Sequence, residues 1–124
     1  MVADVGDKDL TGITELHALL GRGTELHGKL VFEGRVRVDG KVKGSIFGEG
    51  VLILGPTAEV EGDIDVGALI VRGGLVRGDV KAKRSVELYA PARVHGDIAT
   101  QQLYLEKGVT FEGKSTVLEA KVEP

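Results

Sequence analysis

The sequence is organised by a five-residue motif, aliphatic–x–Gly–x–aliphatic, which returns along most of the chain. Its clearest copies occupy residues 42–46, 60–64, 76–80 and 94–98, and weaker copies occupy 26–30 and 111–115. The central glycines stand at positions 28, 44, 62, 78, 96 and 113, so the successive steps are 16, 18, 16, 18 and 17. A nearly fixed period of this length indicates a repeat architecture.

Each period also contains a second apolar signature, a pair of residues at i and i+2. The pairs are Val36/Val38, Val51/Ile53, Leu69/Val71, Val86/Leu88 and Leu103/Leu105. Side chains at this spacing lie on one face of a strand, and we expect all of them to face inward. A third, shorter strand is indicated by Val66, Ala82 and Thr100, which share the inward parity of the motif's last aliphatic residue.

Three short strands in each period describe one turn of a triangular β-solenoid. We therefore predict an all-β protein, a parallel β-helix of about six turns that spans residues 19–118. Short flexible tails, 1–18 and 119–124, flank this body. Within the N-terminal tail, the spacing of Leu10, Ile13, Leu16 and Leu20 is compatible with a short helix over 10–20.

The motif glycines are expected at the corners, where a side chain would collide with the solenoid axis. A valine at Gly62 or Gly78 should then destabilise the body by about 1–3 kcal/mol through overpacking and strain. The composition agrees with such a fold, because 19 glycines accompany only 4% aromatic residues.

Charge and composition disfavour several classes of protein. The formal net charge is −3 with both signs interspersed, whereas a nucleic-acid-binding protein usually carries a clustered basic face. The absence of cysteine excludes disulfides and thiolate metal sites. No apolar run approaches the roughly 18 residues of a membrane span, and the N-terminus lacks a secretory signal pattern. We expect a cytoplasmic protein with no cofactor.

The repeat also resembles a known family. Residues 19–34 followed by 36–40 resemble the opening of a bactofilin domain, and 94–98 with 103–113 resemble its closing coils. The resemblance covers roughly residues 19–118. It implies a bacterial cytoskeletal protein, a right-handed β-helix that assembles end to end without nucleotide into non-polar filaments. The implied role is a scaffold for cell shape or for positioning partners, which could be other bactofilins or cargo proteins.

Many bactofilins reach the membrane through a short apolar N-terminal motif, and the resemblance raises that expectation here. In this chain, however, Val2 and Val5 are interrupted by Asp4, Asp7 and Asp9. Anionic lipid would repel these carboxylates, so direct membrane binding is not favoured. We expect a cytoplasmic, cytoskeletal location, with peripheral placement at the inner membrane as the alternative.

The two ends of a solenoid expose unpaired strand edges and a slice of core, and monomeric solenoids need polar caps there. Neither end of this sequence carries a clear cap, so we predict end-to-end stacking of identical chains. The predicted interface residues are Leu26, Leu30 and Phe32 in the first coil and Val109, Phe111, Val117 and Leu118 in the last. Phe111 is the strongest candidate, because it resembles in position the aromatic residue near the C-terminal interface of bactofilins. The alternative is that Phe111 fills the last internal layer.

A lateral apolar patch is a second candidate surface. If Val51 and Ile53 face inward, then Leu52, Leu54 and Ile70 face outward, and Tyr89 and Tyr104 lie on nearby turns. Such a patch would serve lateral bundling, a partner protein or docking of segment 10–20. The alternative is that this strand bulges and partly buries the patch.

Residues 108–115 match the pattern G-x-x-x-x-G-K-[ST] of a P-loop. A P-loop requires a following helix, whose N-terminus holds the phosphates, and downstream acidic residues that position Mg²⁺. Only nine residues follow Ser115, and Gly113 is in register with the repeat, so we interpret the match as structural.

Histidines and aspartates offer weak metal-site candidates. His27 and His95 share an outward column but are about four turns apart, roughly 19 Å, and His17 is in the tail, so we interpret all three as surface residues. Asp63, Asp79 and Asp97 follow the motif glycine in successive turns. We expect neighbouring Arg77 and Lys81 to neutralise this column, with weak divalent-cation binding as the alternative.

Two other functional classes remain. A monomeric β-helix adaptor could recruit partners through its tails. A left-handed β-helix acyltransferase would need a regular six-residue ladder and a catalytic base, whereas the step here varies between 16 and 18 and no base–nucleophile pair is visible. The sequence therefore predicts a structural polymer rather than an enzyme.

Overall fold

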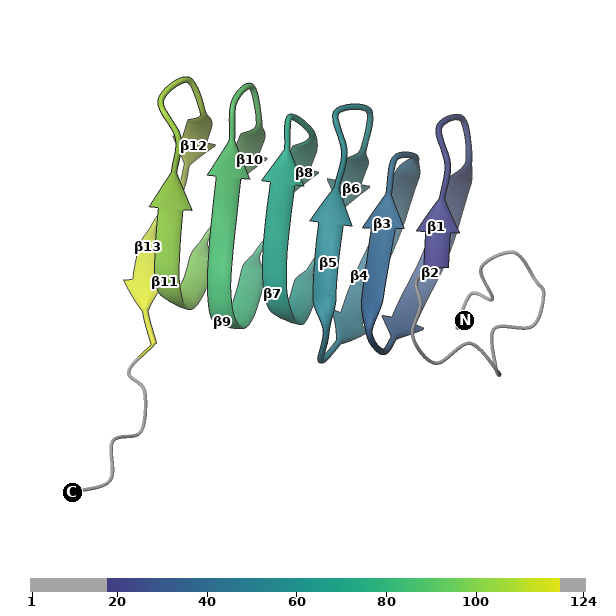
Figure 1. Ribbon diagram of the computed structural model, residues 1–124, viewed down its shortest axis with the longest axis horizontal. Coiled ribbons are helices and arrows are strands. Elements are labelled where there is room, and N and C mark those ends of the chain that lie inside the picture. The colour runs from purple at the N-terminus through teal and green to yellow at the C-terminus, as the bar shows by residue number, and fades with distance from the viewer. Residues whose placement is uncertain (1–17, 119–124) are drawn as a thin grey trace.

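The computed structural model describes residues 18–118 as a single right-handed parallel β-solenoid. In Figure 1 the near strands run upward and the chain crosses over the top to the far strands. It then descends and returns below, one layer closer to the C-terminus. Thirteen strands form one continuous parallel sheet that is wrapped around a narrow core.

Three faces make up the solenoid. The first face contains β1 (Ala18–Leu20), β3 (Arg35–Val38), β5 (Val51–Leu54) and the second halves of β7 (Ile64–Arg72), β9 (Val80–Tyr89) and β11 (Ile98–Leu105). The second face contains the first halves of β2 (Glu25–Phe32) and β4 (Lys41–Gly48), then β6 (Glu59–Glu61), β8 (Leu75–Arg77), β10 (Arg93–His95) and β12 (Thr110–Glu112). The third face contains the second halves of β2 and β4, the first halves of β7, β9 and β11, and β13 (Ser115–Val117).

The strand register reproduces the period of the sequence. On the second face the aligned residues are Glu25, Lys41, Glu59, Leu75, Arg93 and Thr110, so the glycine steps of the sequence recur between layers. Five complete turns of the solenoid thus connect six successive strand layers. The predicted solenoid is confirmed, with slightly fewer turns than the six expected.

The core is a stack of inward side chains, mostly aliphatic, to which each face contributes one or two residues in the inner layers. On the second face Val42, Val60, Val76 and Val94 are fully buried, and on the third face Ile46, Ile64 and Ile98 are at most 1% exposed. The predicted inward residues of the short third strand, Val66, Ala82 and Thr100, are also at most 1% exposed, so that prediction is confirmed. Small and branched side chains fill the narrow axis without aromatic residues in the middle layers.

The predicted parity of β5 is wrong. Leu52 and Leu54 are fully buried, whereas Val51 and Ile53 point outward and are partly exposed. The reason is the register between β3 and β5, which aligns Leu52 with Val36 and Leu54 with Val38. Because Val36 and Val38 face inward, their aligned neighbours must do so as well.

The motif glycines form a ladder in which neighbouring backbones touch. Gly62 has φ +143°, and a Cβ on it would overlap the carbonyl oxygen of Gly44 in the preceding turn. Gly78 has φ +151° and stands in the same relation to Gly62. The obstacle to a side chain is therefore the adjacent turn rather than the solenoid axis, and the positive φ adds backbone strain for any L-residue.

The helix considered over 10–20 lies mostly outside the described residues. Its last three residues, Ala18–Leu20, form strand β1, which pairs with β3. Among residues 18–118, no helix has the length and hydropathy needed to cross a membrane.

Candidate assembly surfaces

Both ends of the described solenoid present strand edges. At the N-terminal end, β1 pairs with β3 and β2 pairs with β4, each through one edge within residues 18–118. At the C-terminal end, β12 pairs with β10 and β13 pairs with β11 in the same one-sided way. The outer edge of each terminal strand therefore carries backbone N–H and C=O groups that another parallel strand could pair with.

The C-terminal end is also apolar. Val117 is 70% exposed and Leu105 is 43% exposed, so both large aliphatic side chains present apolar surface at this end. Leu103, Val109 and Phe111 are only partly buried against the core. Phe111 lies in the last layer of the second face, beside Val94.

Four predicted interface residues thus meet at this end: Val109, Phe111, Val117 and Leu118. Leu103 and Leu105 belong to the same surface and were not predicted as part of it. The signal was present in the sequence, because they form the last i, i+2 pair of the repeat and have no later layer to cover them.

The N-terminal end is different. Leu26 is partly buried, but Leu30 is 1% exposed and Phe32 is 8% exposed. The Phe32 ring lies over Gly48 in the next layer, where the absent side chain leaves room for it. The prediction that Leu30 and Phe32 present apolar surface is therefore wrong for the single chain, and this end offers mainly the backbone edge of β2 and Leu26.

The aspartate column has a structural role. Asp63, Asp79 and Asp97 each accept a backbone N–H from the next turn through Oδ1, at 3.4 Å from Asp79 N, 3.0 Å from Asp97 N and 3.0 Å from Lys114 N. Backbone N–H groups thus supply the compensation that we expected from Arg77 and Lys81. The carboxylates tie successive turns together at the glycine corner.

The P-loop match is part of the solenoid. Residues 110–112 form β12 and residues 115–117 form β13, so a strand stands where a P-loop requires a helix. Histidine contacts are local: His27 Nε2 lies 2.9 Å from Glu25 Oε2, and His95 Nδ1 lies 2.9 Å from Glu112 Oε1. The contact with His27 lowers the pKa of Glu25. His17 lies outside the described residues.

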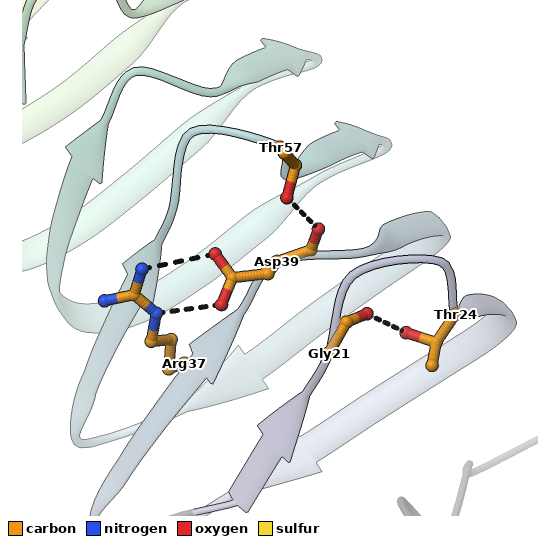
Figure 2. A network of polar contacts seen from close by, with 5 residues as sticks. All are labelled: Gly21, Thr24, Arg37, Asp39 and Thr57. Carbon is orange, nitrogen blue, oxygen red and sulfur yellow. Dashed lines mark hydrogen bonds and ion pairs between the residues drawn. The ribbon is translucent and has the colours of Figure 1, made fainter.

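The outer surface of the first face carries a polar cluster at its N-terminal side and an aromatic cluster at its C-terminal side. At its N-terminal side, Arg37 donates from Nε and Nη2 to the two carboxylate oxygens of Asp39, at 2.9 and 3.2 Å, and the pKa of Arg37 is raised by this pairing (Figure 2). Thr57 donates from Oγ1 to the carbonyl oxygen of Asp39 at 2.6 Å, and Thr24 donates similarly to Gly21 at 2.6 Å. These bonds fix the corner that joins the first and second faces.

At its C-terminal side, the first face carries an aromatic cluster. The rings of Tyr89 and Tyr104 are 5.5 Å apart, and the Arg72 guanidinium lies 5.2 Å from the centre of the Tyr89 ring. The Tyr89 hydroxyl donates to Glu87 Oε1 at 2.6 Å, which raises the pKa of Tyr89. Of the predicted lateral patch, Ile70, Tyr89 and Tyr104 are on the surface, whereas Leu52 and Leu54 are in the core.

Residues 18–118 therefore place the chain in the structural class of parallel β-solenoids, with terminal strands that are paired along one edge within this range. Comparison with known proteins gives the family. The profile of the family described as Bactofilin, polymer-forming cytoskeletal, matches residues 18–116. The chain therefore belongs to the bactofilin family, which is bacterial, cytoskeletal and structural.

Individual relatives agree with this assignment. Bactofilin BacP of Myxococcus xanthus (strain DK1622) is 30% identical over 98 residues, which are 79% of this chain and 40% of BacP. Bactofilin BacO of the same organism is 28% identical over 97 residues, which are 78% of this chain and 76% of BacO. The solid-state NMR structure of the cytoskeletal bactofilin BacA superposes with a TM-score of 0.75 at 36% identity, covering 86% of this chain and all of BacA. The chain spans less than half of BacP.

Proposed function

We propose that this chain assembles end to end into filaments without nucleotide, and that the filaments act as a scaffold for cell shape or for positioning partner proteins. The observation that carries the proposal is the C-terminal end. It combines exposed Val117 and Leu105 with partly buried Phe111 and with the outer edges of β12 and β13. Family membership supports self-association in general.

Stacking a second chain on this end would extend each face by another layer. The added strands would form hydrogen bonds with the N–H and C=O groups of the terminal edges and would bury the apolar side chains. Backbone hydrogen bonding and apolar burial are also the two interactions that hold the layers together within one chain. Nothing in this joint requires the free energy of nucleotide hydrolysis.

The test is negative-stain electron microscopy of the purified protein without nucleotide, beside Phe111→Arg. We expect filaments in the wild type and none in Phe111→Arg, because a guanidinium at the joint would be buried without a partner. The matched control is Leu75→Arg, which makes a similar change on the same face, at a partly exposed outward position of β8 in the third layer from the C-terminal end.

Circular dichroism must show that both variants remain β-rich. Filaments in Phe111→Arg would contradict the proposed joint. A folded wild type that stays monodisperse would instead favour the alternative, a monomeric adaptor that recruits partners through its tails.

A further inference from the structure

We propose that the first face is a self-complementary contact through which two copies pair side by side, with their solenoid axes antiparallel. This inference concerns a surface separate from the ends. It depends on the proposed filaments only for the affinity of lateral association, because many weak lateral contacts act together along a polymer.

The argument begins with the outward residues of the first face, layer by layer. The central column, read from the N-terminal side, consists of Arg37, Ile53, Ile70, Glu87 and Tyr104. The column beside it consists of Arg35, Val51, Ala68, Ser85 and Gln102. A third outward position adds Asp39 to the layer of Arg37 and the exposed Arg72 to the layer of Ile70. A layer with a net positive charge is thus followed by an apolar layer, by a layer that combines Ile70 with Arg72, and then by an acidic layer.

This order is complementary to its own reverse. If a second copy faces the first and is rotated by half a turn about an axis along the strands, the layer order is reversed while the columns still face each other. Arg37 then faces Glu87 of the second copy, Ile53 faces Ile70, and Arg35 faces Ser85 beside Glu87. The half-turn repeats each contact, so the pair contains two Arg37–Glu87 contacts and two Ile53–Ile70 contacts. Because the layers of both copies are about 4.8 Å apart, all four contacts form in a single register.

A parallel arrangement is much poorer. Like layers would meet, so Arg37 would face Arg37 and Glu87 would face Glu87, and like charges placed opposite each other are destabilising. The order of charges along the face therefore favours the antiparallel pair, and we infer that the molecule bound to this face is a second copy of the chain.

The side chains on this face are also held in place before pairing. Asp39 holds the Arg37 guanidinium through two hydrogen bonds, and the pair lies over Gly55, where an added Cβ would come within 2.7 Å of Arg37 Nη2. Figure 2 shows this pair lying along the corner of the solenoid. On the other side, Tyr89 holds Glu87 at 2.6 Å. Pre-oriented groups lose less side-chain entropy on binding.

The acidic side is also hollowed. A shallow depression is lined by Ser85, Glu87, Tyr89, Gln102 and Tyr104. In the antiparallel pair the exposed Arg35 of the second copy enters this depression, where the Glu87 carboxylate and the tyrosine rings can both contact a guanidinium.

The size of the face predicts weak pairing. Six layers of strands about four residues long cover roughly 400 Å² per copy, about half of the roughly 800 Å² per partner in a stable complex. Single subunits should therefore pair only transiently, whereas filaments should associate into bundles.

The first test uses charge reversal. Arg37→Glu and Glu87→Arg should each convert bundles into single filaments in negative stain, with the sedimentable fraction at high speed unchanged. The double variant Arg37→Glu/Glu87→Arg should restore bundles, because position 37 of one copy faces position 87 of the other and their charges are again opposite. Bundling that persists in either single variant, or a double variant that stays unbundled, would overturn the antiparallel contact, as would a wild type that forms only single filaments.

The second test does not need filaments. The chain contains no cysteine, so Arg37→Cys and Glu87→Cys introduce unique thiols. In the Phe111→Arg background at high concentration, a short bifunctional thiol reagent should link the two proteins when they are mixed and leave each protein alone largely unlinked. Cross-linking of each variant with itself would show the parallel pair, and no cross-linking at all would refute the contact even if end-to-end assembly is correct.

Discussion

The glycine ladder gives the sharpest stability prediction. Gly78→Ala places a methyl group where the backbone of the preceding turn already lies, in contact with the carbonyl oxygen of Gly62, and at φ +151°. Strain in this φ region costs about 1–3 kcal/mol, and overpacking against backbone that cannot rotate away costs about another 1–3 kcal/mol. The expected loss is about 2–6 kcal/mol, a large share of the roughly 5–15 kcal/mol typical of a domain.

Two further glycines separate the two contributions. Gly23 has φ +89° but open space where a Cβ would stand, so Gly23→Ala should show strain alone, about 1 kcal/mol. Gly21 has neither a positive φ nor a neighbour within 4 Å, so Gly21→Ala should be neutral or stabilising by less than about 1 kcal/mol.

The assay is urea denaturation followed by circular dichroism, in the Phe111→Arg background so that assembly does not add to the measured stability. We expect the urea concentration at the unfolding midpoint to be highest for Gly21→Ala, lower for Gly23→Ala and lowest for Gly78→Ala. The reasoning would be refuted if Gly78→Ala unfolded at the midpoint of Gly21→Ala, because the close contact between turns would then be absent.

Two other predictions concern polar contacts. Asp79→Ala removes the acceptor of the Asp97 N–H and should lower the free energy of unfolding by about 0.5–1.5 kcal/mol in the same assay. The control is Glu61→Ala, at an exposed position of β6, which should change the free energy of unfolding little. Equal effects of the two substitutions would contradict the structural role of the aspartate column. In a Tyr104→Phe background, ultraviolet titration should place the pKa of Tyr89 above its ordinary value of about 10, because Glu87 stabilises the protonated phenol. Glu87→Gln should move that pKa down. Since the folded pKa is the higher one, the contribution of this contact to stability is present below pH about 10 and is lost as the pH rises through the folded pKa, and an unmoved titration would exclude the contact.

The sequence predicts the solenoid because its strongest constraint is repeated in every turn. Each layer needs a glycine where two backbones touch and aliphatic residues where the faces meet the core, so the period survives all other variation. The inward residues Val60, Val76 and Val94 followed from this period alone, and the structure confirms them.

The parity of β5 was missed because residues 51–54 read Val-Leu-Ile-Leu, an apolar run without alternation. Such a run does not show which residues face inward. The answer lay in the register: the step from Val36 to Leu52 is the same as the step that separates Gly28 from Gly44. Applying that step to β5 would have placed Leu52 and Leu54 inward and Ile53 outward.

Other features depend on contacts that a period does not encode. The aspartate column is compatible with the backbone because each carboxylate accepts an N–H from the next turn, whereas sequence spacing shows only three like charges in a row. The burial of Phe32 similarly depends on the space above Gly48 in the neighbouring layer.

The central claim is that the stacking of layers continues from one chain to the next. The most direct measurement is diffraction from aligned filaments of the wild-type protein, prepared without nucleotide. The account predicts a sharp reflection at about 4.8 Å along the filament axis and a rise of roughly 29 Å per subunit, six layers of about 4.8 Å. A reflection at about 4.8 Å perpendicular to the axis would contradict it, because the solenoids would then lie across the filament rather than along it.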